Sequence, residues 1–98
     1  MSDEHLILVT YDIADERRWR AVFKLMNGFG EWMQLSVFQC RLGAMRRAEL
    51  MARVTDTIAP SEDHVLIVDL GPADRVEPRV QSLGKRSFVP IERVPTIV

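Results

Sequence analysis

The sequence predicts an α+β domain whose elements follow the order strand, helix, strand, strand, helix, strand. Two near-continuous apolar runs, residues 6–11 and 65–68, have the branched and aromatic composition of buried strands. Two stretches between these runs carry apolar residues at helical spacing. The 98 residues, of which 47% are hydrophobic, suffice for one domain with one core.

The first predicted strand, residues 6–12, stops on a carboxylate, Asp12. Its nearly unbroken hydrophobicity predicts burial on both faces. A carboxylate before a helix either caps the coming turn or belongs to a functional site, because strand ends are rigid and open to solvent. The strand alone does not decide between these two roles.

The first helix is predicted to begin at Asp15 and Glu16, where negative charge favours a helix N-terminus, and to end at Asn27 and Gly28. Its apolar side recurs at positions i, i+3, i+4 and i+7, which indicates core packing. The residues of this stripe are Trp19, Val22, Phe23 and Met26.

Residues 32–42 form either one long bulged strand or, as we favour, two short strands joined by a tight turn near Leu35 and Ser36. Gly43 opens a second helix that reaches about Ile58. A turn over residues 60–63 precedes the last apolar strand, residues 64–70.

This order is the split β-α-β pattern of a ferredoxin-like sandwich. In that topology the first strand is central, so Asp12 is expected near Ser36 and the turn at residues 62–64. Two helices cover only one face of the sheet, whereas the central strands are apolar on both faces. A second copy of the sheet is the economical cover, which predicts a homodimer through the sheets.

Residues 1–98 are therefore expected to form one domain, with residues 73–98 as a C-terminal extension. Pro90 and Pro95 interrupt the β-rich end of this extension. Such a segment suits an additional edge strand or arm that pairs with the partner subunit.

Composition excludes several classes of protein. A single cysteine, Cys40, excludes an internal disulfide and a cysteine-cluster metal site, and it is expected to be a small buried residue. The sequence has no apolar run near the roughly 20 residues of a membrane span and no signal-type segment, which predicts a cytoplasmic protein without a membrane partner. The two histidines are far apart, and for His64 we favour a structural role over catalysis.

The net charge of −1 gives no general attraction for polyanions, but arginines crowd the first helix. This cluster is either a solvated helix face or a phosphate-tracking surface. Its residues near the helix start are Arg17, Arg18 and Arg20.

Asp12 is the remaining candidate for chemistry. A magnesium ion takes one or two carboxylates together with waters or phosphates. A two-fold dimer that pairs the strand ends would supply two copies of Asp12, which repel unless a cation lies between them. Mg²⁺ or another divalent cation there could polarise a phosphodiester and activate a water.

Two blocks, residues 8–13 (LVTYDI) and 34–42 (QLSVFQCRL), with Asp15, Arg17 and Arg18 between them, resemble the CRISPR-associated protein family numbered two. The resemblance implies a ferredoxin-like homodimer whose C-terminal strand joins the partner's sheet. It implies a metal-dependent endonuclease that cleaves RNA or double-stranded DNA, with Asp12 as metal ligand. It also implies that the dimer bridges the CRISPR-associated integrase during spacer acquisition.

The resemblance places a catalytic site at Asp12, Tyr11, Ser36 and Phe38 and a nucleic-acid-binding helix start at Arg17, Arg18 and Arg20. Two positions depart from the family. Trp32 stands where many members carry an arginine, and Gln39 where many carry a glutamate. A non-catalytic DNA-binding adaptor and a toxin-like ribonuclease of the same fold remain as alternatives.

Overall fold

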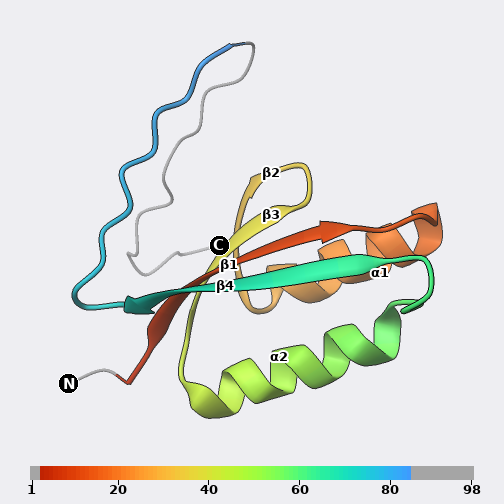
Figure 1. Cartoon of the computed structure of the whole chain (residues 1–98), viewed down its shortest axis with the longest axis horizontal. Helices are drawn as coiled ribbons and strands as arrows, with labels where there is room; N and C mark the ends of the chain where they lie inside the picture. Colours follow the sequence, from red (N-terminus) through yellow and green to blue (C-terminus); the bar gives the residue numbers. More distant parts are fainter. Residues whose placement is uncertain (1–2, 85–98) are drawn as a thin grey trace, which may run out of the picture.

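A four-stranded antiparallel sheet with two helices on one face forms the protein (Figure 1). The structure is a computed structural model and describes residues 3–84. The sheet order is β2-β3-β1-β4, so β1 is central and lies between β3 and β4. This confirms the predicted ferredoxin-like α+β fold. Its elements are β1 (His5–Asp12), α1 (Glu16–Asn27), β2 (Gly30–Gln34), β3 (Val37–Leu42), α2 (Ala44–Thr57) and β4 (His64–Pro72).

Both helices begin and end where the sequence predicts. The side chain of Asp15 caps α1 by accepting a hydrogen bond of 3.0 Å from the amide of Arg18, and Gly28 follows the last helical residue. Gly43 occupies the N-cap position of α2, and Ile58 ends that helix. These boundaries confirm that the local signals were sufficient to place the helices.

The region of residues 32–42 is a hairpin of two strands, as predicted. Its tight turn places Leu35 at φ +35°, in the left-handed region that residues with a side chain rarely adopt. The indole N–H of Trp32 donates a 3.0 Å hydrogen bond to the carbonyl of Leu35, which stabilises the turn.

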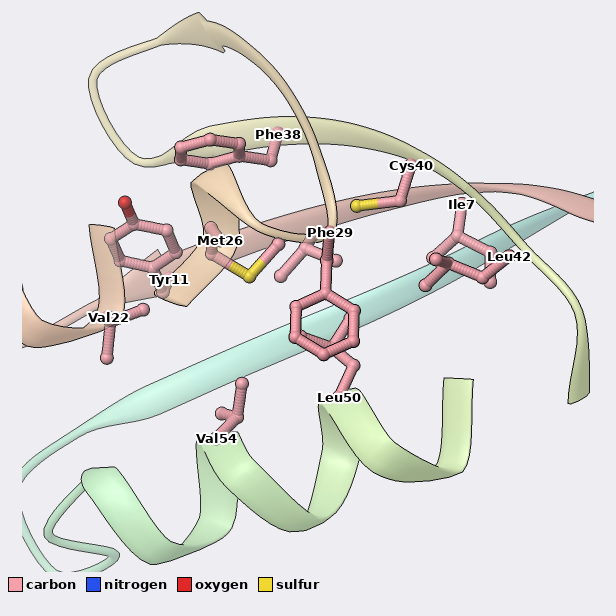
Figure 2. Packing of buried hydrophobic residues seen from close by; sticks show 11 residues of the cluster. Ile7, Tyr11, Val22, Met26, Phe29, Phe38, Cys40, Leu42, Leu50 and Val54 are labelled. Atoms are coloured by element: carbon pink, nitrogen blue, oxygen red, sulfur yellow. The ribbon is translucent and has the colours of Figure 1, made fainter. Parts of the chain in front are cut away.

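The core lies between the sheet and the helices (Figure 2). Alternate residues of β1 point into it, and Val22 of α1 and Leu50 of α2 close it from the other side. Cys40 is part of this core, as predicted, and burial raises the pKa of its thiol to about 12. The sheet residues of this cluster are Ile7, Val9, Tyr11, Phe38, Cys40 and Leu42.

The opposite face of the sheet is apolar but open within residues 3–84. On β4, Leu66, Val68 and Leu70 keep 50%, 41% and 36% of their surface exposed. On β1, Leu6 is fully buried without belonging to the core cluster, whereas Leu8 is only partly buried. Burial of the central strands on both faces is therefore incomplete in the single chain.

The extension leaves the sheet directly after β4. The amide of Ala73 donates to the carbonyl of Glu4 (2.8 Å), and Arg41 donates to the carbonyl of Ala73 (3.1 Å). Residues 73–84 contain no helix or strand. The predicted C-terminal strand falls largely on residues 85–98, which lie outside the described residues. No helix of residues 3–84 is long and apolar enough to cross a membrane.

Replacing Gly30 tests the close approach of β2 and β3. An added Cβ would lie 2.5 Å from the carbonyl oxygen of Gln39 and would also clash with the sulfur of Cys40. We expect Gly30→Ala to lower the free energy of unfolding by about 1–3 kcal/mol, measured by urea denaturation. Gly43→Ala is the matched control, because an added Cβ there meets nothing within 4 Å, and it should change stability by less than about 1 kcal/mol. Equal effects of the two substitutions would contradict this packing.

Candidate functional site

Asp12 ends β1 on the face that the helices leave open. Its neighbour Tyr11 points into the core, and successive side chains of a strand point to opposite faces. Asp12 pairs in register with His64 of β4, and the amide of Tyr11 donates to the carbonyl of Ser36 (3.1 Å). The predicted position of Asp12, beside the starts of β3 and β4, is confirmed. Its exposed carboxylate makes no hydrogen bond or ion pair within residues 3–84.

A second carboxylate, Asp63, holds this end of the sheet together. Its side chain has no exposed surface and accepts hydrogen bonds from the amides of Ala14 (2.9 Å) and Ala59 (2.8 Å). The guanidinium of Arg18 donates two more, from Nε (2.7 Å) and Nη2 (3.2 Å). The side chain of Asp63 thus joins three segments, namely the turn after Asp12, the start of α1 and the turn before β4.

The partners of Asp63 stabilise its charged form. Hydrogen bonds from Arg18 and from the amides of Ala59 and Ala14 hold the pKa of Asp63 well below its usual range, although burial opposes this shift. The carboxylate is therefore ionised throughout the physiological pH range. A buried charge that is fully hydrogen-bonded fixes the geometry of the segments that bond it.

The predicted nucleic-acid-binding arginines lie in three different environments. Arg18 is held by Asp63 and, at 3.4 Å, by Glu62, so it acts first as a structural residue. Arg20 is exposed and paired with Glu16 one turn earlier on α1. Arg17 is exposed and makes no ion pair within the described chain. Arg17 is thus the arginine of this helix start whose charge is most available to a phosphate.

Tyr11 and Phe38 lie in the core beneath the strand end. Their rings stack with centroids 6.3 Å apart, and Phe23 of α1 meets Phe38 edge-on at 5.5 Å. Phe38 is fully buried and Tyr11 is 6% exposed, and burial raises the pKa of Tyr11 to about 12. Both rings lie in the core cluster on the helix side of the sheet (Figure 2). In this structure both rings support the strand that carries Asp12. Their catalytic role stays a prediction.

Ser36 connects the hairpin turn to the rest of the site. Its hydroxyl accepts a 2.8 Å hydrogen bond from the indole N–H of Trp19, and its carbonyl accepts the amide of Tyr11. Ser36 therefore fixes the hairpin against both α1 and β1. A direct role for its hydroxyl in catalysis stays a prediction.

The donor set at Asp12 fits a divalent cation in part. Magnesium commonly keeps several waters and takes one or two carboxylates, so an open carboxylate without a competing cation suits it as one ligand. Within residues 3–84 no group of three or more His, Cys, Asp or Glu side chains is arranged to hold a metal. A complete site would need further ligands, which waters, phosphates or a second chain can provide.

Sequence reasoning missed Asp63. No local pattern relates Asp63 to Arg18, which lies 45 residues earlier. The only available signal was topological, because the predicted fold brings the turn before the last strand to the end of the first.

Replacing Asp63 by Asn should destabilise the protein and weaken its acid-dependent unfolding. Folding lowers the pKa of Asp63, so the ionised carboxylate stabilises the folded state. This contribution to the free energy of unfolding is present above the ordinary pKa of about 4 and is lost as the pH falls below that value. We expect the wild-type protein to lose stability as the pH falls below about 4, the ordinary pKa of an aspartate. Asp63→Asn should be less stable than wild type above this pH and should lose less stability as the pH falls. Thermal unfolding followed by circular dichroism at a series of pH values measures both effects.

Glu62→Gln is the control for this substitution, since Glu62 is the neighbouring carboxylate in the sequence. Its side chain is 61% exposed, and its contact with Arg18 is the longer one, at 3.4 Å. It should unfold close to wild type. A Glu62→Gln effect as large as that of Asp63→Asn would show that Asp63 is not the organising group.

Comparison with known proteins gives the family. The family model described as "CRISPR associated protein Cas2" matches residues 5–77. The chain is 55% identical over 95 residues to the CRISPR-associated endoribonuclease Cas2 of Geobacter sulfurreducens, covering 97% of this chain and 99% of the relative. It is 52% identical over 95 residues to the CRISPR-associated endoribonuclease Cas2 1 of Rhodospirillum rubrum, covering 97% and 92%.

The fold leads to the same family. The crystal structure of Streptococcus pyogenes Cas2 at pH 6.5 superposes with a TM-score of 0.71 and 32% identity, covering 81% of this chain and 99% of that chain. The family model, which matches residues 5–77, includes the strand that carries Asp12 and the hairpin that carries Ser36. These are the two blocks that carry the resemblance in sequence. The chain belongs to the CRISPR-associated protein Cas2 family.

Proposed function

We propose that this protein is a metal-dependent endonuclease of the CRISPR adaptation system that cleaves phosphodiester bonds of RNA or double-stranded DNA. The observation that carries the proposal is the open carboxylate of Asp12, which lies unpaired on a rigid strand end. Support also comes from two relatives at 55% and 52% identity, which are named endoribonucleases.

In this proposal Asp12 holds Mg²⁺ or another divalent cation. Such a cation polarises a phosphodiester and lowers the pKa of a water. The chain itself provides the placement of the carboxylate, because Asp63 and Ser36 tie the neighbouring turns to β1. Arg17 provides a charge for a substrate phosphate at the start of α1.

The proposed active form is a homodimer through the open face of the sheet. Leu66 and Val68 expose apolar surface on the face that carries Asp12, and a second copy would remove this surface from water. Two copies of Asp12 could then share one cation, which would relieve their mutual repulsion. The dimer is further proposed to bridge the CRISPR-associated integrase during spacer acquisition, and for this partner the support is family membership alone.

A second candidate is a non-catalytic adaptor that binds duplex DNA. The exposed guanidinium of Arg17 favours it, because phosphate contacts need only accessible positive charge. This candidate uses the same fold and the same dimer, but it assigns no role to Asp12. The two candidates therefore differ in what replacing Asp12 would do.

Asp12→Asn should abolish cleavage while leaving the fold intact. We expect cleavage of labelled RNA or duplex DNA in Mg²⁺ to fall by more than about 100-fold, since even the groups that support metal ligands contribute 10–100-fold. EDTA should abolish wild-type cleavage. Asp56→Asn is the control, because Asp56 is an exposed carboxylate on α2, away from the open face. Cleavage that survives both Asp12→Asn and EDTA would contradict the proposal, and a wild type that binds duplex without cleaving it would favour the adaptor.

Val68→Asp should convert the protein to a monomer. A carboxylate at this 41% exposed position would have to be desolvated between two sheets, which is unfavourable. In sedimentation velocity we expect wild type at twice the chain mass of 11.3 kDa and Val68→Asp near the single chain. Met45→Asp on α2, at an 88% exposed position away from this face, should remain dimeric. A monomeric wild type would contradict the proposed dimer.

A further inference from the structure

His64, the first residue of β4, is the direct cross-strand neighbour of Asp12. Both residues are exposed and, as a register pair of an antiparallel ladder, both lie on the face that the helices leave open. Directly opposite residues in such a ladder have Cβ atoms about 4.5–5.5 Å apart. A carboxylate and an imidazole at this separation can reach one small ion together.

Neither side chain is engaged elsewhere among residues 3–84. The other histidine, His5, lies at the opposite end of β1, where its Nδ1 is 2.9 Å and 3.0 Å from the two carboxylate oxygens of Asp69. Asp69 also accepts a hydrogen bond from Arg47 (2.8 Å). The described chain therefore contains one imidazole that is hydrogen-bonded to a carboxylate, His5, and one that is open beside an open carboxylate, His64.

We propose that His64 is a second protein ligand of the cation held by Asp12. This inference rests on the proposed function for the role of Asp12, and it adds a ligand outside the two blocks, residues 8–13 and 34–42, that carry the family resemblance. One carboxylate oxygen and one imidazole nitrogen per chain form an N,O donor set. In the proposed dimer the two chains would supply four such ligands.

The donor set determines the class of cation. Mg²⁺ and Ca²⁺ take oxygen ligands, whereas imidazole suits later first-row cations such as Co²⁺, Ni²⁺ and Zn²⁺. The site should therefore bind a late transition cation more tightly than Mg²⁺. Such a preference would distinguish this chain from a site built from carboxylates alone.

Isothermal titration calorimetry on the full-length, untagged protein tests the inference with Co²⁺ and Mg²⁺ as the probes. We expect His64→Gln to weaken Co²⁺ binding by at least about 10-fold and to change Mg²⁺ binding by less than about 2-fold, because only the late cation gains from imidazole. Asp12→Asn should weaken both. His5→Gln is the matched control and should leave the Co²⁺ affinity unchanged, because His5 lies at the far end of the sheet.

Proton NMR adds a readout that does not depend on cleavage. The chain has two histidines, so spectra of His64→Gln and His5→Gln assign both imidazoles. Substoichiometric Co²⁺ should shift or broaden the His64 signals and leave those of His5 in place. Broadening of His5 alone would overturn the inference, since the cation would then be bound at the wrong end of the sheet.

Failure of this inference can be separated from failure of the proposed function. Equal Co²⁺ affinity of wild type and a folded His64→Gln overturns the inference, and the same preparation still cleaves nucleic acid in Mg²⁺ if the proposed function is right. Co²⁺ binding that requires both Asp12 and His64 supports the inference, even where wild type cleaves neither RNA nor duplex DNA and the proposed function fails.

Discussion

The buried charge of Asp63 is the constraint on which this end of the molecule depends. A carboxylate without exposed surface must have hydrogen-bond donors, since an unpaired buried charge would be very costly. Its donors come from the amides of Ala14 and Ala59 and from Arg18. The turn after β1 and the turn before β4 are thereby fixed to the start of α1. Asp12 lies two residues before Ala14, so the hydrogen bond from Ala14 to Asp63 fixes the position of Asp12 as well. Asp12 itself makes no hydrogen bond to Asp63.

Within residues 3–84 the helices cover only one of the two faces of the sheet, and the two faces differ in composition. The helix layer encloses the aromatic rings and Cys40, which makes that face a packing surface. The other face combines exposed apolar residues of β4, among them Leu66, with the polar pair Asp12 and His64 at one end. An apolar area next to open ligand-type side chains is typical of a surface that a partner completes. The proposed chemistry and the proposed dimer therefore use the same face.

Local patterns in the sequence were enough to predict the helices and strands. The topology of the predicted fold was enough to predict where Asp12 lies in the sheet. Caps, helical stripes and the hairpin turn depend on neighbours within a few residues, so Asp15 and Leu35 could be interpreted without a structure. The ion pair between Arg18 and Asp63 could not be predicted from local patterns, since the two residues are 45 positions apart. The catalytic role of Tyr11 stays a prediction, and the structure shows its ring buried in the core. Tyr11 and Asp12 are consecutive in one strand, so their side chains point to opposite faces of the sheet.

The same alternation settles how the two departures from the family motif bear on the site. Trp32 pairs in register with Phe38, and its ring meets Phe23 of α1 at 6.3 Å, so it lies on the helix side of the sheet. A tryptophan in place of arginine at this position extends the aromatic packing and removes no charge from the face of Asp12. Gln39 is different, because its register partner is Leu8, which places it on the open face. Glutamine in place of glutamate there removes a negative charge from that face. Gln39 lies four residues along the ladder from Asp12, about 13 Å by the rise of an extended strand, so it is not a neighbour of Asp12. The cross-strand neighbour of Asp12 is His64, and in the proposed site its imidazole favours a cation that accepts nitrogen as well as oxygen.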